Sequence, residues 1–156
     1  MNQLIQIRNT YRITQQQAAE ILGVSLRTYQ RYESDFVSNN KKYINLLKIL
    51  EDNLAITEEK GLLSISQIKD IVNPILGKYQ INRCYLFGSY ARREPRENSD
   101  VDLLIDTDIT GLKFFSLVEE LRTSLHKKVD VVRIKDLTAN NELVIDILRE
   151  GVLIKQ

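Results

Sequence analysis

The sequence lacks several residue types on which common classes of protein depend. Its 156 residues include one cysteine, one histidine, two prolines and no tryptophan. A single cysteine excludes an internal disulfide, and Cys84, which stands in an apolar segment, is expected to be a small core residue. No zinc-ligand spacing, Walker A loop or dinucleotide-binding fingerprint is present. Because there is neither a signal peptide nor an apolar run long enough to cross a bilayer, we expect a cytoplasmic protein with no membrane partner.

Charge is distributed unevenly along the chain. Residues 1–50 contain seven Lys or Arg against three acids, a net charge of +4, whereas the remainder carries −3. A basic head on an acidic body suits contact with DNA at one end only. A charge of +4 is modest for a monomeric DNA-binding protein, and a dimer would double it and match a two-fold operator.

The segment 15–32 has the pattern of two short helices joined by a turn at Gly23. Small and apolar residues recur at core spacing on both sides of this glycine, and Ser25 would cap the second helix. Helical pairs of this kind also occur as plain packing units, so the spacing alone leaves that interpretation open.

The same segment resembles the repressor-type, XRE-like helix-turn-helix. The resemblance places the opening of the first helix at 14–19 and makes 27–33 the recognition helix. Its outward side chains would face the major groove, and glutamines of the first helix would contact phosphate. The residues expected to contact DNA are Gln16, Gln17, Arg27, Thr28, Gln30 and Arg31.

The clearest signal for a reactive site is the Leu-Phe-Gly-Ser turn that ends at Ser89. Residues 83–87 are short, apolar and aromatic, which predicts a buried strand. Gly88 would break this strand and let the backbone approach an anion closely. Ser89 would begin a helix over 89–94, where free amides and its own hydroxyl can bind phosphate. A plain strand-to-helix turn with a serine cap is the alternative on these two residues.

Acidic residues follow on two further predicted strands. In the strand 100–106, Asp100 and Asp102 project the same way, about 6 to 7 Å apart, because side chains alternate between faces. Like charges this close repel each other, and a divalent cation would relieve the repulsion. An exposed acidic edge is the alternative interpretation. Asp130 is the only acid in the predicted strand 127–132, and it joins the other two if that strand lies beside theirs.

The segments 86–92 and 99–104 together resemble the signature of the minimal nucleotidyltransferases of the DNA polymerase beta superfamily, the MNT type. The resemblance covers about residues 64–156 and includes a closing segment, 147–152, that is similar to the family's last helix. Arg93 departs from the pattern, since many members carry glycine there. An arginine is compatible with a position on a surface helix, so this departure bears only on the local loop shape.

The resemblance implies a site for two Mg²⁺ ions, with ATP as the substrate. Two such ions activate the acceptor oxygen and neutralise charge on the nucleotide phosphates and the leaving pyrophosphate. The third carboxylate would complete one ion site and orient the attacking hydroxyl, and an arginine would contact the triphosphate. The implied catalytic and metal-binding residues are Asp100, Asp102 and Asp130, and the implied nucleotide-binding residues are Gly88, Ser89 and Arg92.

We therefore expect an α+β protein of two domains. An N-terminal all-α helix-turn-helix domain would occupy residues 1–56, followed by a linker at 57–64. A small nucleotidyltransferase domain would occupy residues 65–156 and contain a short mixed sheet flanked by helices.

Three further helices are predicted outside the two motifs. One spans 41–54 and completes the first domain, and one runs from a cap at Ser66 towards Tyr79, bent or split at Pro74. The third lies between the second and third strands. Two apolar stripes are expected to face the core: Ile44, Leu47 and Leu50 or Leu54 in the first helix, and Leu112, Phe115, Val118, Leu121 and Leu125 in the third.

The resemblance also implies a biological role. MNT-type proteins often act as antitoxins that transfer AMP from ATP to a tyrosine of a HEPN-type ribonuclease toxin. A helix-turn-helix on such a protein points to autoregulation of the operon, so the expected partners are a HEPN-type toxin and operator DNA, in a homodimer or a hetero-oligomer with the toxin. Two alternatives are a transcriptional regulator with a nucleotide-sensing body and a small-molecule nucleotidyltransferase of the aminoglycoside type. The second usually carries a further helical domain, for which this chain is too short.

Overall fold

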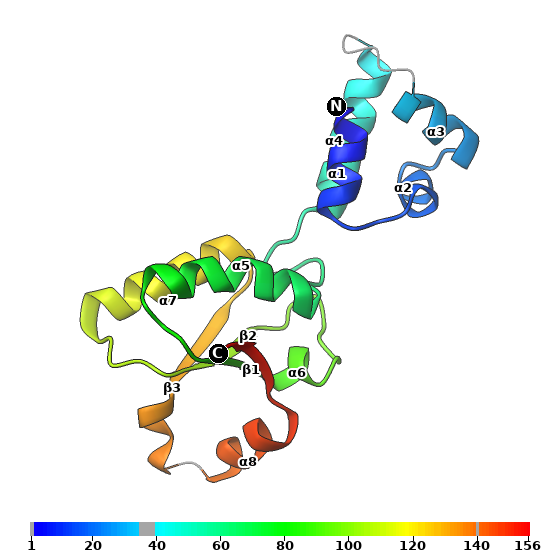
Figure 1. Ribbon diagram of the computed structural model, residues 1–156. Helices are drawn as coiled ribbons and strands as arrows, with labels where there is room; N and C mark the ends of the chain where they lie inside the picture. Colours follow the sequence, from blue (N-terminus) through cyan, green and yellow to red (C-terminus); the bar gives the residue numbers. More distant parts are fainter. Residues whose placement is uncertain (1, 35–39, 140) are drawn as a thin grey trace. The chain divides into compact units, whose positions relative to one another are not determined.

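Two separate hydrophobic cores divide the chain into the units Met1–Ala55 and Ile56–Gln156 in the computed structural model (Figure 1). The structure describes residues 2–34, 40–139 and 141–156. The first unit is helical and the second combines helices with a sheet, which confirms the α+β class. Within the described ranges no helix has the length and apolar character that a bilayer span requires.

The first unit contains the predicted helix-turn-helix. Gly23 makes the turn at φ +64°, and the Ser25 hydroxyl caps the second helix by accepting from the Thr28 amide at 3.2 Å. The helix that precedes this pair was not indicated by the sequence pattern. The helix that follows the pair spans the predicted residues, 41–54. Among the described residues of this unit, the helices are α1 (Gln3–Thr10), α2 (Gln15–Ile21), α3 (Leu26–Ser34) and α4 (Lys41–Leu54).

The core of this unit differs from the prediction on one face of α4. Leu50 is buried as expected, but Ile44 is half exposed and Tyr43 is buried in its place. The inward stripe of α4 therefore differs from the prediction only at its first position, where Tyr43 also has a polar partner inside the core. The fully or nearly fully buried residues are Leu4, Ala18, Ala19, Tyr29, Tyr43 and Leu50.

Asn2 is that polar partner, and it connects three helices. Its amide nitrogen donates to the carbonyls of Tyr32 and Glu33, both at 2.8 Å. Its amide oxygen accepts from the Leu4 amide at 2.9 Å, which caps α1, and from the Tyr43 hydroxyl at 2.6 Å. A buried side-chain amide with four partners is fully satisfied, so its burial carries little desolvation penalty.

The second unit is built on a four-stranded mixed sheet in the order β3-β2-β1-β4. Only β2 and β3 run parallel. The last strand was not predicted. Residues 147–152 were expected to resemble a closing helix, but that helix ends at Glu150 and the chain turns at Gly151 into β4. The elements are α5 (Ile65–Lys78), β1 (Cys84–Phe87), α6 (Gly88–Ala91), β2 (Val101–Ile105), α7 (Gly111–Leu125), β3 (Val129–Arg133), the 3₁₀ helix η1 (Ile134–Ala139), α8 (Asn141–Glu150) and β4 (Val152–Lys155).

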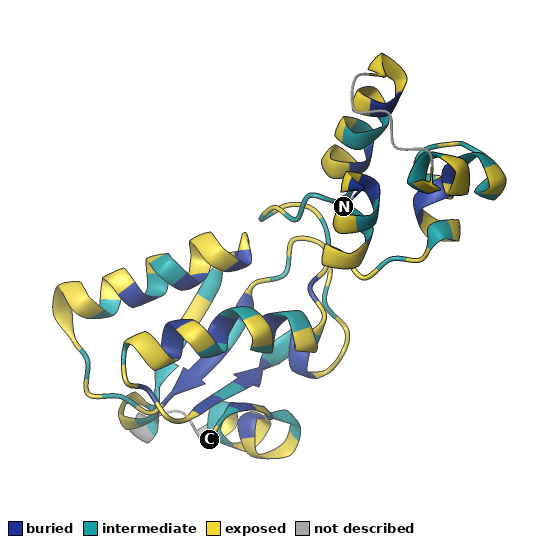
Figure 2. Cartoon of the chain, turned by 45° about the horizontal axis from the view of Figure 1, so that its top comes forward, coloured by how far each residue is buried: buried dark blue, intermediate teal, exposed yellow. Residues whose placement is uncertain are grey.

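The two faces of the sheet have different neighbours (Figures 1 and 2). Leu103 and its alternate neighbours in β2 face α5 and α7 in the main core. Leu104 packs with Phe87 and Ile147 in a smaller cluster beneath α8. Since side chains alternate along a strand, Asp102 lies on the same face as Leu104 and hence on the α8 side.

Helix α5 begins two residues earlier than predicted and is continuous. Its cap is Ser64, whose hydroxyl accepts from the Gln67 amide at 3.1 Å, while the Gln67 side chain accepts from the Ser64 amide. The predicted cap at Ser66 is therefore wrong. Pro74 lies inside the helix without splitting it; it is exposed, and the neighbouring Ile75 and Leu76 are buried in the core.

The apolar stripe predicted for α7 is wrong at the first turns of the helix. Leu112 is 86% exposed and Phe115 is 69% exposed. The buried residues are Leu117, Leu121 and Leu125, which recur every four residues and pack in the main core. Leu112 and Phe115 do not belong to this four-residue series, so they lie off the buried stripe.

The predicted linker, residues 57–64, lies within the second unit. Thr57 and Lys60 exchange backbone hydrogen bonds of 2.9 and 3.3 Å in a tight turn. Gly61 follows at φ +81°, and Leu63 is buried in the main core. This segment therefore packs on the sheet domain, and the division between the two units falls after Ala55.

The Asn2 network gives a graded stability prediction. We expect Asn2→Ala to destabilise the first unit by about 2–4 kcal/mol, because it removes four hydrogen bonds, two of them buried and two part-buried. Tyr43→Phe removes one donor and should cost about 1 kcal/mol. Hydrogen exchange of the α1, α3 and α4 amides measures this unit separately from the second. An Asn2→Ala effect no larger than that of Tyr43→Phe would contradict the role of Asn2 as the connection between helices.

Candidate active site

Three chain segments meet at one end of the sheet. Strands β2 and β3 are parallel and both begin there, whereas β1 is antiparallel to β2 and ends there. The register pairs Phe87 with Asp102 and Asp102 with Asp130. The end of β1 therefore lies beside two carboxylates that are 28 residues apart in the sequence.

Asp102 is the central acid of this group. It is half-buried, whereas Asp130 and Asp100 are exposed. Burial, and after it the negative charges of Asp130 and Asp100, raise the pKa of Asp102 to about 6 against a smaller opposing effect of Arg92. Four predicted site residues are therefore close enough to interact electrostatically.

Gly88 packs directly against the Asp102 carboxylate. A Cβ atom at this position would overlap a carboxylate oxygen of Asp102 and stand 2.9 Å from its carboxyl carbon. The backbone of Gly88 also has φ +68°, a conformation that side chains other than glycine rarely adopt. Only glycine allows the turn to approach the acid this closely.

Ser89 follows in α6, which is a single turn rather than the predicted helix over 89–94. Arg92 is the C-terminal cap, and Arg93 has φ +62°. The expectation that Arg93 stands on a surface helix is therefore wrong. A left-handed backbone at this position favours glycine, the residue that the resemblance had led us to expect.

Arg92 is exposed, and it forms an ion pair with a residue that the sequence did not indicate. Its guanidinium lies 3.5 Å from a carboxylate oxygen of Glu150, at the end of α8. This contact joins α8 to the turn that carries Ser89. No sequence signal marks Glu150, because the two residues are 58 positions apart and meet only through the fold.

The three carboxylates do not lie close enough together to form a complete set of metal ligands. Among the described residues, no three acidic, histidine or cysteine side chains stand together as an ion-binding group. The backbone register nevertheless places Asp102 beside Asp130, and the mutual effect on the Asp102 pKa shows that the charges interact. Repulsion among unneutralised carboxylates opposes closer approach.

The residues predicted to contact DNA lie on α2 and α3. Gln16, Arg27, Gln30 and Arg31 are exposed. Gln17 is exposed too, but its side chain accepts from the Thr14 amide at 2.8 Å and so completes the cap of α2. Thr28 is half-buried, and its hydroxyl bonds that of Ser25 at 2.8 Å. Exposed residues of α3, together with Thr28, line a shallow hollow: Arg27, Thr28, Gln30, Arg31 and Ser34.

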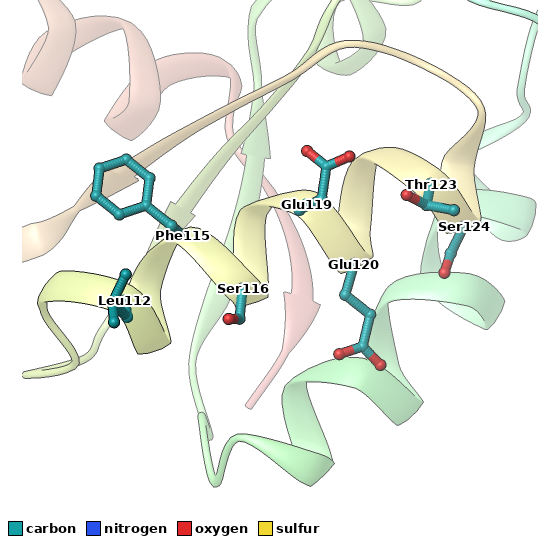
Figure 3. Close-up of a pocket in the computed structure, with 7 residues that line it drawn as sticks. All are labelled: Leu112, Phe115, Ser116, Glu119, Glu120, Thr123 and Ser124. Atoms are coloured by element: carbon teal, nitrogen blue, oxygen red, sulfur yellow. The ribbon is translucent and has the colours of Figure 1, made fainter.

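A second hollow follows the outer face of α7 (Figure 3). Exposed Leu112 and Phe115 lie at one end, and Glu119 and Glu120 lie farther along the helix. None of the predicted site residues lines this hollow, which is therefore separate from the acidic end of the sheet.

The fold and site define a nucleotidyltransferase domain preceded by a helix-turn-helix domain. Residues 66–156 match the family described as "Polymerase beta, Nucleotidyltransferase", and residues 4–51 match a helix-turn-helix family. The first match covers more than half of the chain. The protein therefore belongs to the polymerase beta nucleotidyltransferase family.

Relatives with protein adenylyltransferase names match the second unit. MJ0435 of Methanocaldococcus jannaschii, which carries that name provisionally, is 39% identical over 77 residues, or 45% of this chain and 77% of MJ0435. Protein adenylyltransferase MntA of Thermococcus cleftensis is 31% identical over 100 residues, or 60% of this chain and 99% of MntA. A crystal structure of a toxin-antitoxin with AMP-PNP has 23% identity and a TM-score of 0.47, over 55% of this chain and 71% of that one. That degree of structural likeness is too low to bear on what this chain binds.

Removing the Asp102 charge should stabilise the metal-free protein at neutral pH. The folded-state pKa of about 6 lies above the unfolded value near 4, so ionisation destabilises the fold as pH rises through this window. In EDTA, Asp102→Asn should match the wild type at pH 4 and exceed it by roughly 1–2 kcal/mol at pH 7.5, after allowance for the exposure of a half-buried group.

Calorimetry of the thermal transition across this pH range measures the difference. Asp106→Asn is the matched control, since Asp106 is exposed at the far end of the same strand and 3.9 Å from Arg83. A wild type as stable as Asp102→Asn at pH 7.5 would show that the acids do not repel in the folded state.

Gly88→Ala should abolish nucleotidyl transfer, because the added methyl group displaces Asp102. A misplacement of about 1 Å can cost a hundredfold in rate. Gly111→Ala is the matched control: Gly111 has φ +59°, and a Cβ added there would have no atom within 4 Å, so this variant tests the backbone penalty alone. That penalty is about 1–2 kcal/mol of stability. Equal activity losses in the two variants, measured by release of pyrophosphate from a nucleoside triphosphate, would contradict the close packing at Gly88.

Proposed function

We propose that this protein transfers AMP from ATP to a hydroxyl group of a partner protein at the acidic end of the sheet. The observation that carries the proposal is the contact between the Gly88 turn and the Asp102 carboxylate, with Asp130 on the next strand. Nucleotidyl transfer needs a phosphate-holding turn and a carboxylate cluster in the same place. The turn and the two carboxylates come from separate segments of the chain.

The donor set suits divalent cations. Asp100, Asp102 and Asp130 offer only carboxylate oxygens, which are the ligands that Mg²⁺ prefers. Burial, and after it repulsion by Asp130 and Asp100, disfavours ionisation of Asp102, and a cation would oppose both effects. In our proposal Asp100 and Asp102 hold two Mg²⁺ ions and Asp130 completes one of the sites. Bound Mg²⁺ would neutralise phosphate charge and acidify the acceptor hydroxyl.

The remaining residues of the turn would bind and orient the nucleotide. The Gly88 turn, packed against the Asp102 carboxylate, would bind phosphate through free backbone amides, and the Ser89 hydroxyl can donate to a phosphate oxygen. Arg92 would supply a positive charge, held near the turn by Glu150. Asp130 would accept a hydrogen bond from the attacking hydroxyl and so fix its direction.

A protein acceptor is favoured by the relatives that cover the second unit, whose names describe protein adenylyltransferases. The MNT resemblance extends the proposal to a HEPN-type ribonuclease toxin as partner and a toxin tyrosine as acceptor. This chain would then be the antitoxin of the pair.

DNA binding by the first unit completes the proposal. Arg27, Gln30 and Arg31 are exposed on the second helix of a helix-turn-helix, where side chains of this kind reach base edges and phosphates. Gln16 and Gln17 at the start of α2 would contact phosphate, and Thr28 lies between the arginines. Binding to the operator of its own gene pair would provide autoregulation.

The transfer reaction can be tested on the product of the neighbouring gene. Incubation with this protein, ATP and Mg²⁺ should add one or more AMP units to that partner, measured by intact mass spectrometry. The double variant Asp100→Asn/Asp102→Asn should add none, because it removes the proposed cation ligands. It should still bind operator DNA, because both substitutions lie in the second unit. Transfer that persists in this variant would overturn the assignment of the acids.

The reciprocal variant serves as the control for the DNA-binding unit. Arg27→Ala/Arg31→Ala should lose the gel shift of operator DNA and retain AMP transfer. If the wild type binds DNA but modifies no protein, the regulator hypothesis replaces the enzyme hypothesis. Transfer to a small hydroxylated acceptor in place of the partner would identify a small-molecule enzyme.

A further inference from the structure

A buried lysine lies next to the strand that carries Asp130. Lys127 has no exposed surface, although lysine is almost never fully buried without a charged partner. Its ammonium group donates to the Lys60 carbonyl at 3.2 Å and to the Glu97 carbonyl. Both of these partners are backbone carbonyls. The neighbouring Lys128 is exposed, so two adjacent lysines have opposite environments.

Stability alone is a weak reason for this arrangement. Burial lowers the pKa of Lys127, against the opposing effects of Glu97, Glu59 and Glu58, so the charged form loses solvation in the fold. An apolar side chain of similar length would fill the same space without that penalty. An apolar residue could not hold the Lys60 and Glu97 carbonyls in fixed positions, as Lys127 does.

One of these carbonyls belongs to the segment that leads into Asp100. The segment is held at its start by the Glu94 amide, which donates to the Ser89 carbonyl at 3.0 Å. It is held at its end by the Val101 amide, which donates to the Lys128 carbonyl at 2.9 Å. Between these points, Lys127 binds the Glu97 carbonyl three residues before Asp100. A turn within this stretch, in which the Ser99 amide donates to the Arg96 carbonyl at 2.9 Å, does not attach it to the rest of the unit. Without the Lys127 bond, six residues would separate the attachments at Glu94 and Val101.

We propose that Lys127 is a positioning residue for the carboxylate site: by holding the Glu97 carbonyl it sets where Asp100 stands relative to Asp102 and Asp130. This inference rests on the proposed function and identifies a residue that acts through the backbone. Because Lys127 precedes Asp130 by three residues, one side chain links the two segments that supply the outer acids of the group. Its removal should weaken cation binding more than nucleotide binding.

The test compares Lys127→Met with two matched variants. Lys128→Met removes the same charge from an exposed neighbour, and Leu125→Ala destabilises the main core but keeps the Lys127 side chain that binds the Glu97 carbonyl. Two quantities are measured: the Mg²⁺ concentration for half-maximal AMP transfer at saturating ATP, and binding of Mn²⁺ alone by electron paramagnetic resonance. The second reports on the site without any turnover.

We expect Lys127→Met to raise about tenfold both the Mg²⁺ concentration for half-maximal transfer and the Mn²⁺ concentration for half-maximal binding. The KM for ATP at saturating Mg²⁺ should change less than twofold. Lys128→Met and Leu125→Ala should leave both cation concentrations within twofold of the wild type. If Lys127→Met lowers the melting temperature but leaves cation binding unchanged, the residue is purely structural and the inference is wrong.

A second variant keeps the inference testable if Lys127→Met does not fold. Lys127→Gln retains a donor but is too short to reach both carbonyls, so it should shift cation binding in the same direction. The failure of the proposed function is distinguishable: a wild type that binds Mn²⁺ but transfers no AMP would refute the function, while the Mn²⁺ comparison among variants would still decide the role of Lys127.

Discussion

The parallel pairing of β2 with β3 is the constraint on which the site depends. This register places Asp102 beside Asp130, although each acid belongs to a different part of the sequence. A shift by one residue would turn Asp102 towards the main core and expose Leu103 and Ile105 on the opposite face. The apolar residues that face α5 and α7 therefore fix the position of the carboxylates.

This arrangement places unfavourable interactions at the site. Asp102 is half-buried next to like charges, and Gly88 has a left-handed backbone pressed against its carboxylate. Residues that conflict with local stability are typical of functional sites, where the surrounding structure holds them in place. Here the surrounding structure is the main core on one face and the Leu104 cluster under α8 on the other.

In each of the two units, a buried polar side chain connects separate segments by hydrogen bonds. Asn2 joins the backbone of α3 to α1 and α4 in the first, and Lys127 joins two loops to the start of β3 in the second. Apart from Leu4, which lies two residues from Asn2, the bonded groups lie between 30 and 67 residues away in the sequence. Apolar packing tolerates small displacements, whereas a hydrogen bond has a narrow range of length and angle, so such residues set the positions of segments that packing alone would leave loose.

The sequence by itself determined the elements whose signals are local. The turn at Gly23, the cap at Ser25, the strand before Gly88 and the alternation around Asp102 all depend on neighbours within a few residues, and each was predicted. Tertiary structure decided the rest. The pairing of Asp102 with Asp130, the contact of Arg92 with Glu150, the strand β4, the exposure of Leu112 and Phe115 and the burial of Lys127 depend on which segments meet in space. Side-chain type constrains local conformation, but burial and partnership are properties of the whole packed chain.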